Sequence, residues 1–246
     1  GEDVLLRDMG DGRRSLPSFR DLGYPAGKME SRAVFLFRAG REPVYLLGQE
    51  VNGCRGLGYF PICELKDVLP EWVFFAGATA LHLSRWYEGN RYCGRCGGRM
   101  ERKPGQRALA CPECGNTVYP GIAPVVMVAV TDGDRLLMTK YADRSLPQWV
   151  LISGFVEAGE TLEEAAEREV YEETGIRIRD LRYFGSQPWG FSGSVIAGYT
   201  ARLDGPDGIR LDRKELAAAE WHPRTGLPDG LTDISIAYEM IEALRL

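Results

Sequence analysis

Two C-x-x-C pairs constrain this chain more than any other feature of its sequence. Cys93 and Cys96 form one pair, Cys111 and Cys114 form the other, and fourteen residues rich in glycine and arginine separate them. Four thiolates at this spacing converge on one tetrahedral cation, which is typical of a zinc ribbon. The alternative is two disulfides, but a C-x-x-C pair does not favour local bridging. We therefore expect a structural Zn²⁺ with no open coordination position, and no catalysis at the cysteines.

The segment around the cysteines is basic, although the whole protein has a net charge of -5. Its cations are Arg91, Arg95, Arg99, Arg102, Lys103 and Arg107. Such a segment can bind nucleic acid, but a solvated surface that keeps a small module soluble is the simpler interpretation. The net negative charge argues against broad binding to phosphate backbones.

Strand-like runs alternate with glycine, proline and charge clusters ahead of the cysteines. Apolar runs at residues 33–37, 44–47 and 57–60 predict a small mixed or mostly β domain. Residues 78–87 carry apolar positions at helical spacing and predict a helix that ends near Gly89. No catalytic pattern stands out in this region.

The chain therefore divides into three parts, residues 1–88, 89–118 and 119–246. The last part begins with strand patterns at 125–130 and 135–139, followed by a loop and a helix. Hydrophobic residues are 44% and charged residues 26% of the chain, which are globular values. No apolar run approaches the roughly 18 residues of a membrane-spanning helix, and no secretory signal is visible, so we expect a cytoplasmic protein with no membrane partner.

The most informative stretch is a glutamate-rich helix predicted over residues 162–174. Thr161 followed three residues later by Glu164 is a capping box, and Gly175 is a suitable C-terminal stop. At about 100° per residue, Leu162, Ala165 and Ala166 mark the inward side. Three glutamates fall on the same side and are called the helix glutamates below. They are Glu169, Glu172 and Glu173.

The helix glutamates repel one another because they are spaced i, i+3 and i+4. They also lie at the helix C-terminus, where the macrodipole opposes negative charge. Mg²⁺ or Mn²⁺ would offset this repulsion, since both take oxygen ligands and commonly hold substrate phosphates. The alternative is an acidic, exposed helix without a metal, but these glutamates share their side with small apolar residues.

The same stretch resembles the signature of a known enzyme family. Gly154, five residues, Glu160, seven residues, and then the run Arg-Glu-Val-Tyr-Glu-Glu-Thr-Gly-Ile over residues 168–176 match the whole Nudix box of the Nudix hydrolases. The resemblance implies an α/β/α sandwich in which the box forms a loop, a helix and a loop. It also implies Mg²⁺-dependent hydrolysis of a nucleoside diphosphate linked to another moiety.

A second resemblance narrows the family. Residues 186–194, Ser-Gln-Pro-Trp-Gly-Phe-Ser-Gly-Ser, are similar to the segment that distinguishes the NADH pyrophosphatase branch. That branch also places a four-cysteine zinc ribbon just before the Nudix domain and a less regular domain ahead of it. The resemblance implies an α+β multi-domain protein that hydrolyses NADH or NAD⁺ to a nicotinamide mononucleotide and AMP. It also implies a homodimer, with the first domain as the expected interface.

Residues of this second segment are the expected substrate contacts. Trp189 and Phe191 offer flat apolar surfaces for a base or nicotinamide ring, and Gln187 and Ser194 offer hydrogen-bonding groups. The alternative is a β-bend with core aromatics. The substrate-binding set implied by the resemblance is Tyr119, Phe155, Gln187, Pro188, Trp189, Phe191, Ser194 and Ala237, the last near the reacting phosphates.

The resemblance also implies the catalytic roles. Metal ions held by the helix glutamates would neutralise the diphosphate and lower the pKa of a bound water. The expected catalytic set is Glu173, Glu172 and Arg168, with Glu173 as both metal ligand and proton acceptor. Arg168 would orient the glutamates, with a bidentate contact to Glu160. The backbone carbonyl of Ser153 is a further metal ligand by resemblance.

Three positions depart from the family pattern. Ser153 stands where the family usually has alanine, a minor change if only its carbonyl is used. Alignment on Glu215 and Trp221 puts Ala218 where the family has an additional metal-binding glutamate. Glu220 is the alternative carboxylate, although a shift of two residues along a strand changes its neighbours on the same face. Gly121 stands where the family commonly has arginine. The number of metal ions and the choice between Mg²⁺ and Mn²⁺ stay open.

Three other functions stay open from the sequence. Removal of the NAD cap from RNA 5′ ends uses the same bond chemistry, and the basic ribbon residues favour it. A nucleotide-sensing Nudix module without useful turnover is motivated by Ala218, and a nucleic-acid adaptor by the ribbon. The helix glutamates argue against both non-enzyme functions, because a repulsive cluster has no evident use without a cation. No P-loop or G-x-G-x-x-G run indicates ATPase or redox use of a dinucleotide.

Overall fold

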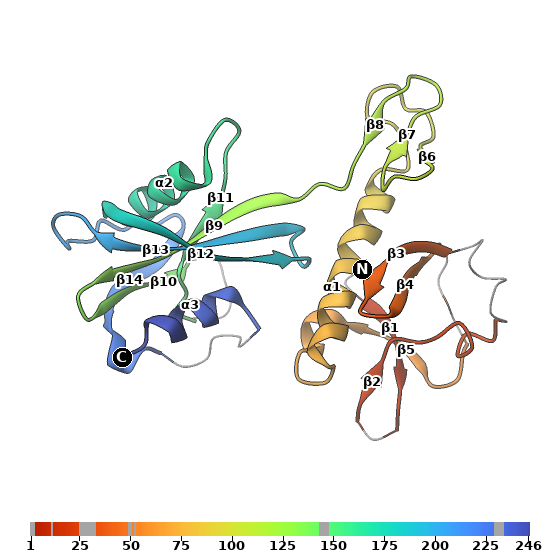
Figure 1. The fold of residues 1–246 in the computed structure, drawn as a ribbon, viewed down its shortest axis with the longest axis horizontal. Helices are drawn as coiled ribbons and strands as arrows, with labels where there is room; N and C mark the ends of the chain where they lie inside the picture. The colour runs from red at the N-terminus through yellow and green to blue at the C-terminus, as the bar shows by residue number, and fades with distance from the viewer. Residues whose placement is uncertain are drawn as a thin grey trace. The chain divides into compact units, whose positions relative to one another are not determined.

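The computed structural model describes seven parts of the chain, which are residues 3–10, 12–24, 33–48, 51, 53–142, 148–228 and 234–246. The chain divides into two compact units (Figure 1). Unit 1 comprises residues 1–121 together with 189–193, and unit 2 comprises residues 122–188 together with 194–246. None of the helices in the described ranges combines the length and apolar character needed to cross a membrane.

Unit 1 begins with two small sheets. In one sheet, β1 (Asp3–Asp8) lies between β2 (Arg14–Ser15) and β5 (Leu57–Pro61) and pairs with both in antiparallel register. In the other, β3 (Ala33–Ala39) pairs with β4 (Glu42–Leu47). The three predicted apolar runs are confirmed as β3, β4 and β5. Strands β1 and β2 lie outside the predicted runs.

One long helix, α1 (Glu71–Gly89), packs against both sheets of unit 1. A short 3-10 turn, η1 (Ile62–Leu65), precedes it. The helix ends at the predicted residue, where Asn90 closes the last turn through its backbone N–H and its side-chain amide. It begins seven residues before the predicted start. The bulky run at residues 72–75 reads as strand from sequence alone, whereas packing against the sheets makes it helical.

The cysteine segment forms a three-stranded ribbon that follows α1 directly. Its strands are β6 (Glu101–Arg102), β7 (Leu109–Ala110) and β8 (Thr117–Val118), in that order. Trp86 of α1 packs in the same buried cluster as the ribbon residues. Arg107 donates a side-chain hydrogen bond to the backbone carbonyl of Leu36 in β3.

Unit 2 is built on one six-stranded mixed sheet with the order β12-β13-β9-β10-β14, in which β11 also pairs with β9. The strands are β9 (Ala123–Asp132), β10 (Arg135–Tyr141), β11 (Ile152–Phe155), β12 (Ile178–Trp189), β13 (Ser194–Leu203) and β14 (Leu216–Pro223). β9 is parallel to β13 and antiparallel to β10 and β11. The predicted strands at residues 125–130 and 135–139 are confirmed as the cores of β9 and β10. A 3-10 turn, η2 (Arg224–Gly226), follows β14.

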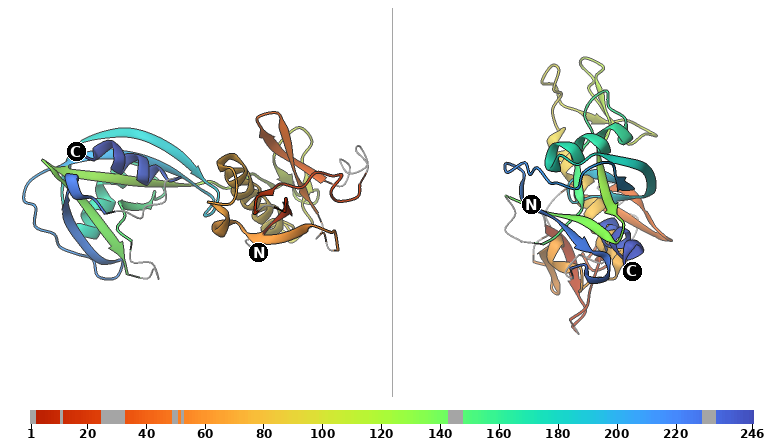
Figure 2. Two further views of the ribbon diagram at one scale, coloured as in Figure 1. Left: turned by 90° about the horizontal axis from the view of Figure 1, so that it is seen from below. Right: turned by 90° about the vertical axis from the view of Figure 1, so that its left-hand side faces the viewer.

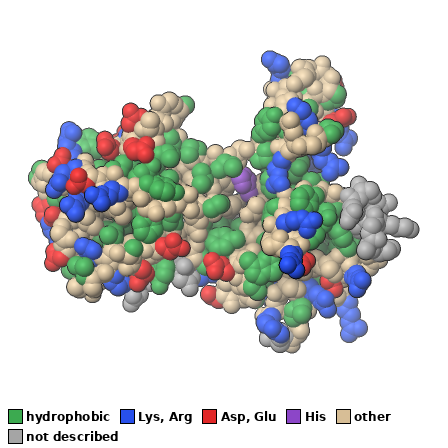
Figure 3. All heavy atoms as spheres, viewed as in Figure 1, with side chains coloured by type: hydrophobic (Ala, Val, Ile, Leu, Met, Phe, Trp, Pro, Cys, Tyr) green, Lys and Arg blue, Asp and Glu red, His purple; other side chains and the backbone are tan. Residues whose placement is uncertain are grey.

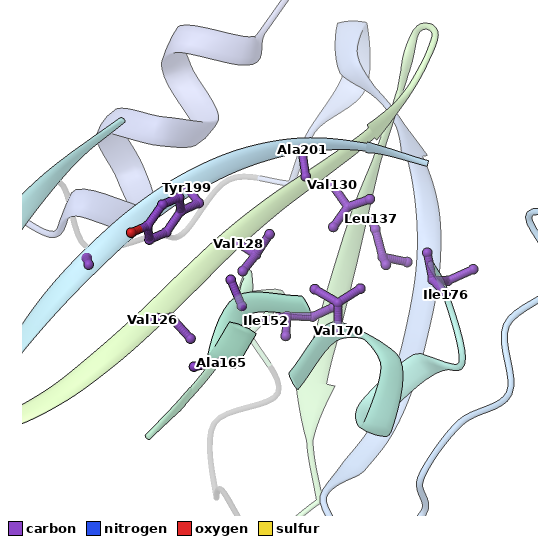
Figure 4. Packing of buried hydrophobic residues seen from close by; sticks show 12 residues of the cluster. Val126, Val128, Val130, Leu137, Ile152, Ala165, Val170, Ile176, Tyr199 and Ala201 are labelled. Carbon is purple, nitrogen blue, oxygen red and sulfur yellow. The ribbon is translucent and has the colours of Figure 1, made fainter. Parts of the chain in front are cut away.

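Two helices cover opposite faces of this sheet (Figures 1 and 2). The face toward α2 (Leu162–Thr174) carries the main buried cluster (Figure 4). That cluster includes Val126, Val128, Val130, Leu137, Ile152, Ala165, Val170 and Tyr199. The other face receives α3 (Ile236–Leu244), where a Cβ atom on Gly198 would lie 2.7 Å from the sulfur of Met240. Since residues alternate between the faces of a strand, this arrangement confirms the expected α/β/α sandwich.

Candidate active site

The two C-x-x-C pairs form two turns of the same geometry. In each turn a glycine donates its backbone N–H to the carbonyl of the first cysteine at 2.9 Å, Gly97 to Cys93 and Gly115 to Cys111. Both glycines have positive φ, 79° and 73°. A side chain at either position would be strained there. The backbone therefore fixes where each pair of thiols lies before any cation binds.

The four thiols converge on one point in unit 1. Their sulfurs all lie within 4.8 Å of one another, with 3.6 Å between Cys93 and Cys114 and 3.5 Å between Cys96 and Cys111. Four sulfurs at this separation fit a single tetrahedral Zn²⁺ and leave no position for a water or a substrate. The expected structural zinc site is therefore confirmed in its ligand set.

The thiols are not equivalent in their protonation. Hydrogen bonds from the backbone amide of Arg95, and then from that of Cys96, lower the pKa of Cys93 to about 6. The backbone amide of Gly98 lowers the pKa of Cys96, but hydrogen bonding with the neighbouring thiols outweighs it and raises that pKa to about 12. The thiolate of Cys93 thus forms readily, whereas the thiol of Cys96 keeps its proton. A divalent cation would relieve this competition, because thiolates are the metal-binding form.

Several cationic side chains lie over the ribbon on the face that Figure 3 shows, where they are coloured blue. Five of the six predicted cations are exposed, and Lys103 is partly exposed. Arg107 also contributes to structure through its bond to the backbone of β3. Nucleic-acid binding and a solvated surface that keeps the module soluble therefore both stay open as interpretations of this basic surface.

Helix α2 has the two ends that the sequence predicts. Glu164 donates its backbone N–H to the hydroxyl of Thr161 at 3.1 Å, and its carboxylate accepts the backbone N–H of Thr161 at 2.8 Å. Gly175 caps the other end with a φ of 70°. The helix bounds of 162 and 174 are confirmed, because both signals are local.

The inward side of α2 carries two of the three helix glutamates. Glu169 is 8% exposed and Glu173 is 2% exposed, on the same face as the buried alanines. The prediction was wrong for Leu162, which is 36% exposed, and for Glu172, whose side chain is 59% exposed. Leu162 lies in the first turn of the helix, and Glu172 lies about 100° from the middle of the buried face.

Arg168 connects the glutamates of α2 to the loop before it. Its guanidinium donates two hydrogen bonds to Glu160, from Nε at 2.7 Å and from Nη2 at 2.9 Å. Nη1 donates to Glu169 at 2.7 Å and to Glu172 at 3.0 Å. Nη2 also donates to the carbonyl of Phe155 at 3.0 Å. The predicted bidentate contact with Glu160 is therefore present, and one arginine orients three carboxylates.

The Arg168 contact fixes the charge of Glu160. The hydrogen bonds from Arg168, and then the backbone amide of Glu157, lower the pKa of Glu160 to about 2. Glu160 is therefore ionised throughout the neutral range. Its role in this geometry is to hold Arg168, since both of its oxygens accept from that guanidinium.

Glu173 is the least satisfied carboxylate of the site. Its Oε2 atom is buried and has no hydrogen-bond partner among the described residues. Burial raises its pKa to about 8, and the negative charges of Glu169, Glu215 and Asp212 add to this effect. Burial also raises the pKa of Glu169. A buried carboxylate without a partner is costly, and a hard divalent cation is the group that would satisfy it.

The carboxylates do not form a compact cage by themselves. Within the described ranges, only the four cysteines bring three or more ligand atoms within 4.8 Å of one another. Glu169 and Glu172 instead have oxygens turned to Arg168. The helix glutamates thus form a looser, open arrangement, in contrast to the closed set of thiols.

Strand β11 approaches α2 closely in front of the glutamates. A Cβ atom at Gly154 would lie 2.0 Å from the carboxyl carbon of Glu169, so any larger residue there would displace this carboxylate. The neighbouring Ser153 accepts from the hydroxyl of Tyr141 on its carbonyl at 3.2 Å, and its own hydroxyl lies 2.8 Å from the same group. The metal-ligand role of the Ser153 carbonyl stays a prediction.

Comparison with known proteins decides the family. Residues 121–244 match the model of the NUDIX domain. The chain belongs to the Nudix family. Residues 90–119 match the NADH pyrophosphatase zinc ribbon domain, as the second resemblance implied.

Relatives of this Nudix protein span most of its length. It is 37% identical over 194 residues to the NAD-capped RNA hydrolase NudC of Vibrio atlanticus, covering 78% of this chain and 72% of that protein. It is 35% identical over 201 residues to the protein of the same name from Shigella dysenteriae, covering 82% and 76%. Among solved structures, a NUDIX hydrolase from Nitrosomonas europaea has a TM-score of 0.46 and 24% identity, covering 56% of this chain and 80% of that one.

Gln187, a predicted substrate contact of the Nudix domain, already uses both ends of its amide. Its Nε2 donates to the carbonyl of Ile234 at 2.8 Å, and its Oε1 accepts the backbone N–H of Ile236 at 2.8 Å. These bonds tie the end of β12 to the start of α3, where Ala237 is buried. A direct bond from Gln187 to the substrate stays a prediction.

Residues 189–193 belong to unit 1 and pack on α1. The rings of Trp189 and Phe191 lie 5.0 Å apart, and Phe191 lies 5.2 Å from Phe74 of α1. Arg85 donates to the carbonyl of Phe191 at 2.8 Å. A Cβ atom on Gly190 would lie 2.7 Å from the α1 backbone, so the segment fits closely. Phe191 therefore has a packing role in addition to the predicted contact with substrate.

The remaining predicted substrate residues differ in exposure. Tyr119 and Phe155 are large and exposed, and Tyr119 donates from its hydroxyl to Gln106 at 3.2 Å. Ser194 and Ala237 are buried in unit 2. Exposed aromatic rings are free to stack on a base, whereas a buried alanine would act through its backbone.

Two acidic residues outside the predicted site lie close to Glu173. They are Asp212 and Glu215, whose charges raise the pKa of Glu173. Nothing in their local pattern links them to a helix about forty residues earlier. The alternative carboxylate, Glu220, lies 3.9 Å from His222.

Proposed function

We propose that this Nudix hydrolase cleaves the diphosphate bond of NADH or NAD⁺ and releases a nicotinamide mononucleotide and AMP. One observation carries the proposal. Arg168 organises Glu160, Glu169 and Glu172 around the buried, unpartnered carboxylate of Glu173, in a chain that also carries the NADH pyrophosphatase zinc ribbon.

The helix glutamates would hold Mg²⁺ or Mn²⁺ in this proposal. When bound, the metal neutralises the diphosphate and lowers the pKa of a bound water. The chain's own residues supply the rest. Arg168 orients Glu169 and Glu172 through its hydrogen bonds, and the Oε2 atom of Glu173 would accept the proton of the attacking water. The carbonyl of Ser153 would add one neutral ligand.

Substrate binding would use the aromatic and backbone groups around the strand ends. The exposed rings of Tyr119 and Phe155 are suited to stacking on the base or the nicotinamide. Trp189 is a further flat ring that the resemblance implies for the substrate. The backbone at Ala237, in the first turn of α3, would lie near the phosphates, and Gln187 holds that turn in place.

A second candidate substrate is RNA that carries an NAD cap. The two relatives described above are named NAD-capped RNA hydrolases, and the exposed cations around the ribbon are suited to a phosphate backbone. The bond that is cleaved would be the same. Cleavage of capped RNA should then fall with added salt much more steeply than cleavage of NADH.

We also propose the organisation that the sequence predicts. It comprises an N-terminal domain over residues 1–88, a ribbon over 89–118 and a Nudix domain over 119–246, assembled as a cytoplasmic homodimer. Four thiols in a zinc site fit a reducing compartment, which supports this location. Light scattering at several protein concentrations would test the dimer.

The decisive experiment is NADH hydrolysis with Mg²⁺ or Mn²⁺, with AMP and reduced nicotinamide mononucleotide resolved. We expect metal-dependent release of both nucleotides, and a loss of about 10²-fold or more in kcat for Glu173→Gln. The matched control is Glu167→Gln, an exposed glutamate of the same helix that should behave as the unmodified protein. If NADH, NAD⁺, ADP-ribose and capped RNA all stay intact with either metal, the proposed function is wrong.

A further inference from the structure

We propose that Glu215 binds the same divalent cation as Glu169 and Glu173. It would supply the carboxylate that Ala218 lacks. This inference rests on the proposed function, because it concerns the metal of that site.

The loop before β14 is bonded to the C-terminal end of α2. Arg210 donates its backbone N–H to the carbonyl of Thr174 at 2.8 Å, and Asp212 donates to the carbonyl of Glu173 at 2.9 Å. Both carbonyls lie at the end of the helix, where carbonyls lack helical partners. The loop is therefore held against the helix end that carries Glu173 by backbone bonds that do not depend on a metal.

A tight turn then places Glu215 directly after this contact. Leu216 donates its backbone N–H to the carbonyl of Asp212 at 2.9 Å, which closes one turn of chain. The carbonyl of Glu215 accepts the N–H of Ala142 at 2.9 Å, so the end of β10 holds the residue from the other side. The backbone of Glu215 is thus held through its own carbonyl and through the residue that follows it.

An irregularity in the sheet occurs at the same place. Tyr141 pairs with Leu216, but the preceding residue of β10, Lys140, pairs with Ala218, so Ala217 is an extra residue in β14. Such bulges redirect side chains next to functional sites. Tyr141 is also the residue that donates to the carbonyl of Ser153, a predicted metal ligand.

The charge of Glu215 acts on both buried glutamates. It contributes to the raised pKa of Glu169 and to that of Glu173, after burial in each case. Glu215 itself is exposed, and among the residues that the structure describes no donor to its carboxylate is recorded. The buried Oε2 atom of Glu173 likewise has no partner. Two unpartnered carboxylates close enough to interact form a suitable set for one hard cation.

Ala218 and Glu220 do not fill this role in the geometry. Ala218 has no oxygen in its side chain and pairs with Lys140. Glu220 lies farther along β14, where it pairs with Met138 and approaches His222 at 3.9 Å. The carboxylate next to Glu169 and Glu173 is therefore that of Glu215, just before β14.

The test is Mn²⁺ binding to the zinc-loaded protein, measured by calorimetry and by the electron paramagnetic resonance signal of free Mn²⁺. We expect Glu215→Gln to raise the Kd for Mn²⁺ about tenfold or more, and Glu220→Gln to change it less than about twofold. Glu173→Gln serves as the reference for loss of a ligand in the proposed function.

Thermal unfolding supplies a second measurement that a merely structural role would not reproduce. Without Mn²⁺, Glu215→Gln should melt at the same temperature as the unmodified protein or higher, because it removes repulsion. The rise in Tm on adding Mn²⁺ should shrink, since a weaker ligand stabilises less.

Three results would overturn the inference, and they separate it from the proposed function. Unchanged Mn²⁺ affinity in Glu215→Gln, together with a loss in Glu173→Gln, removes Glu215 as a ligand and leaves the proposed function intact. A loss in Glu220→Gln instead assigns the carboxylate to that residue. Unchanged affinity in Glu173→Gln as well means that the metal site of the proposed function is also wrong.

Discussion

The two ligand sets of this protein, the ribbon cysteines and the carboxylates around α2, are built in opposite ways. The cysteines lie within 22 residues of chain and are brought together by two glycine turns of one geometry. The carboxylates come from a helix and from a loop that backbone bonds hold against its end. The thiols form a closed set, whereas Glu173 keeps an oxygen without a partner. A structural site can satisfy all its groups, but a site that must admit water and substrate cannot.

The largest expected effect is the loss of zinc when one of the four ribbon cysteines is replaced. Cys111→Ser removes one of four thiolates, and we expect loss of zinc and unfolding of the ribbon, since structural zinc contributes about 10–16 kcal/mol of binding free energy to such modules. Elemental analysis and limited proteolysis between residues 90 and 119 would measure this. Cys63→Ser, at an exposed cysteine outside the ribbon, is the control. Full zinc content in Cys111→Ser would contradict the closed arrangement.

The next largest expected effect is the pH dependence of folding stability that Glu173 causes in the protein without Mg²⁺ or Mn²⁺. The folded-state pKa of Glu173 is raised to about 8 from 4.5, so the folded state holds a proton that the unfolded state has lost between these values. The contribution of Glu173 to the free energy of unfolding is therefore at its maximum below pH 4.5 and falls as the pH rises toward 8. Chemical denaturation across that range should show the decline.

Glu173→Gln should remove most of this decline, because glutamine does not titrate. The stability contribution of Glu160 depends on pH in the opposite direction. Its pKa is lowered to about 2, so its contribution is present above pH 4.5 and is lost as the pH falls toward 2. If the free energy of unfolding declines between pH 4.5 and 8 equally in Glu173→Gln and in the unmodified protein, Glu173 is not the cause. Its carboxylate would then have a hydrogen-bond partner in the folded protein.

The smallest expected effect is on kcat, when Arg168 is replaced by lysine. It tests the carboxylates around α2 without touching the ribbon cysteines. Arg168→Lys keeps the charge but loses the planar fork that serves Glu160, Glu169 and Glu172 together. We expect kcat for NADH to fall about 10- to 100-fold with the zinc content unchanged. Arg179→Lys, in exposed ion pairs with Asp180 and Asp204, is the matched control. Equal activity in both variants would show that the fork is not needed.

The parts of this fold that the sequence predicts are those with local causes. The bounds of α2 follow from Thr161, Glu164 and Gly175, which act within one turn of the helix ends. The cysteine ribbon follows from spacing alone. The parts that it does not predict depend on tertiary contacts. Burial of Glu169 and Glu173 but not Glu172 depends on where the sheet covers the helix.

Contacts between distant segments account for the other differences. The approach of Asp212 and Glu215 to α2 rests on backbone hydrogen bonds, which carry no sequence signature. The same is true of Gln187, whose amide is bonded to the backbone around Ser235. The sequence gives its residue type, and only the structure gives its partners.

The packing of residues 189–193 on α1 limits how modular this chain can be. These five residues comprise the last residue of β12 and the connection to β13, yet they form part of unit 1 through Phe191, Gly190 and the hydrogen bond from Arg85. A fragment that begins at residue 122 would carry this segment without the helix that it packs on. Exchange of the N-terminal region between relatives would therefore have to conserve the surface of α1, so the two halves of the gene are not free to recombine independently.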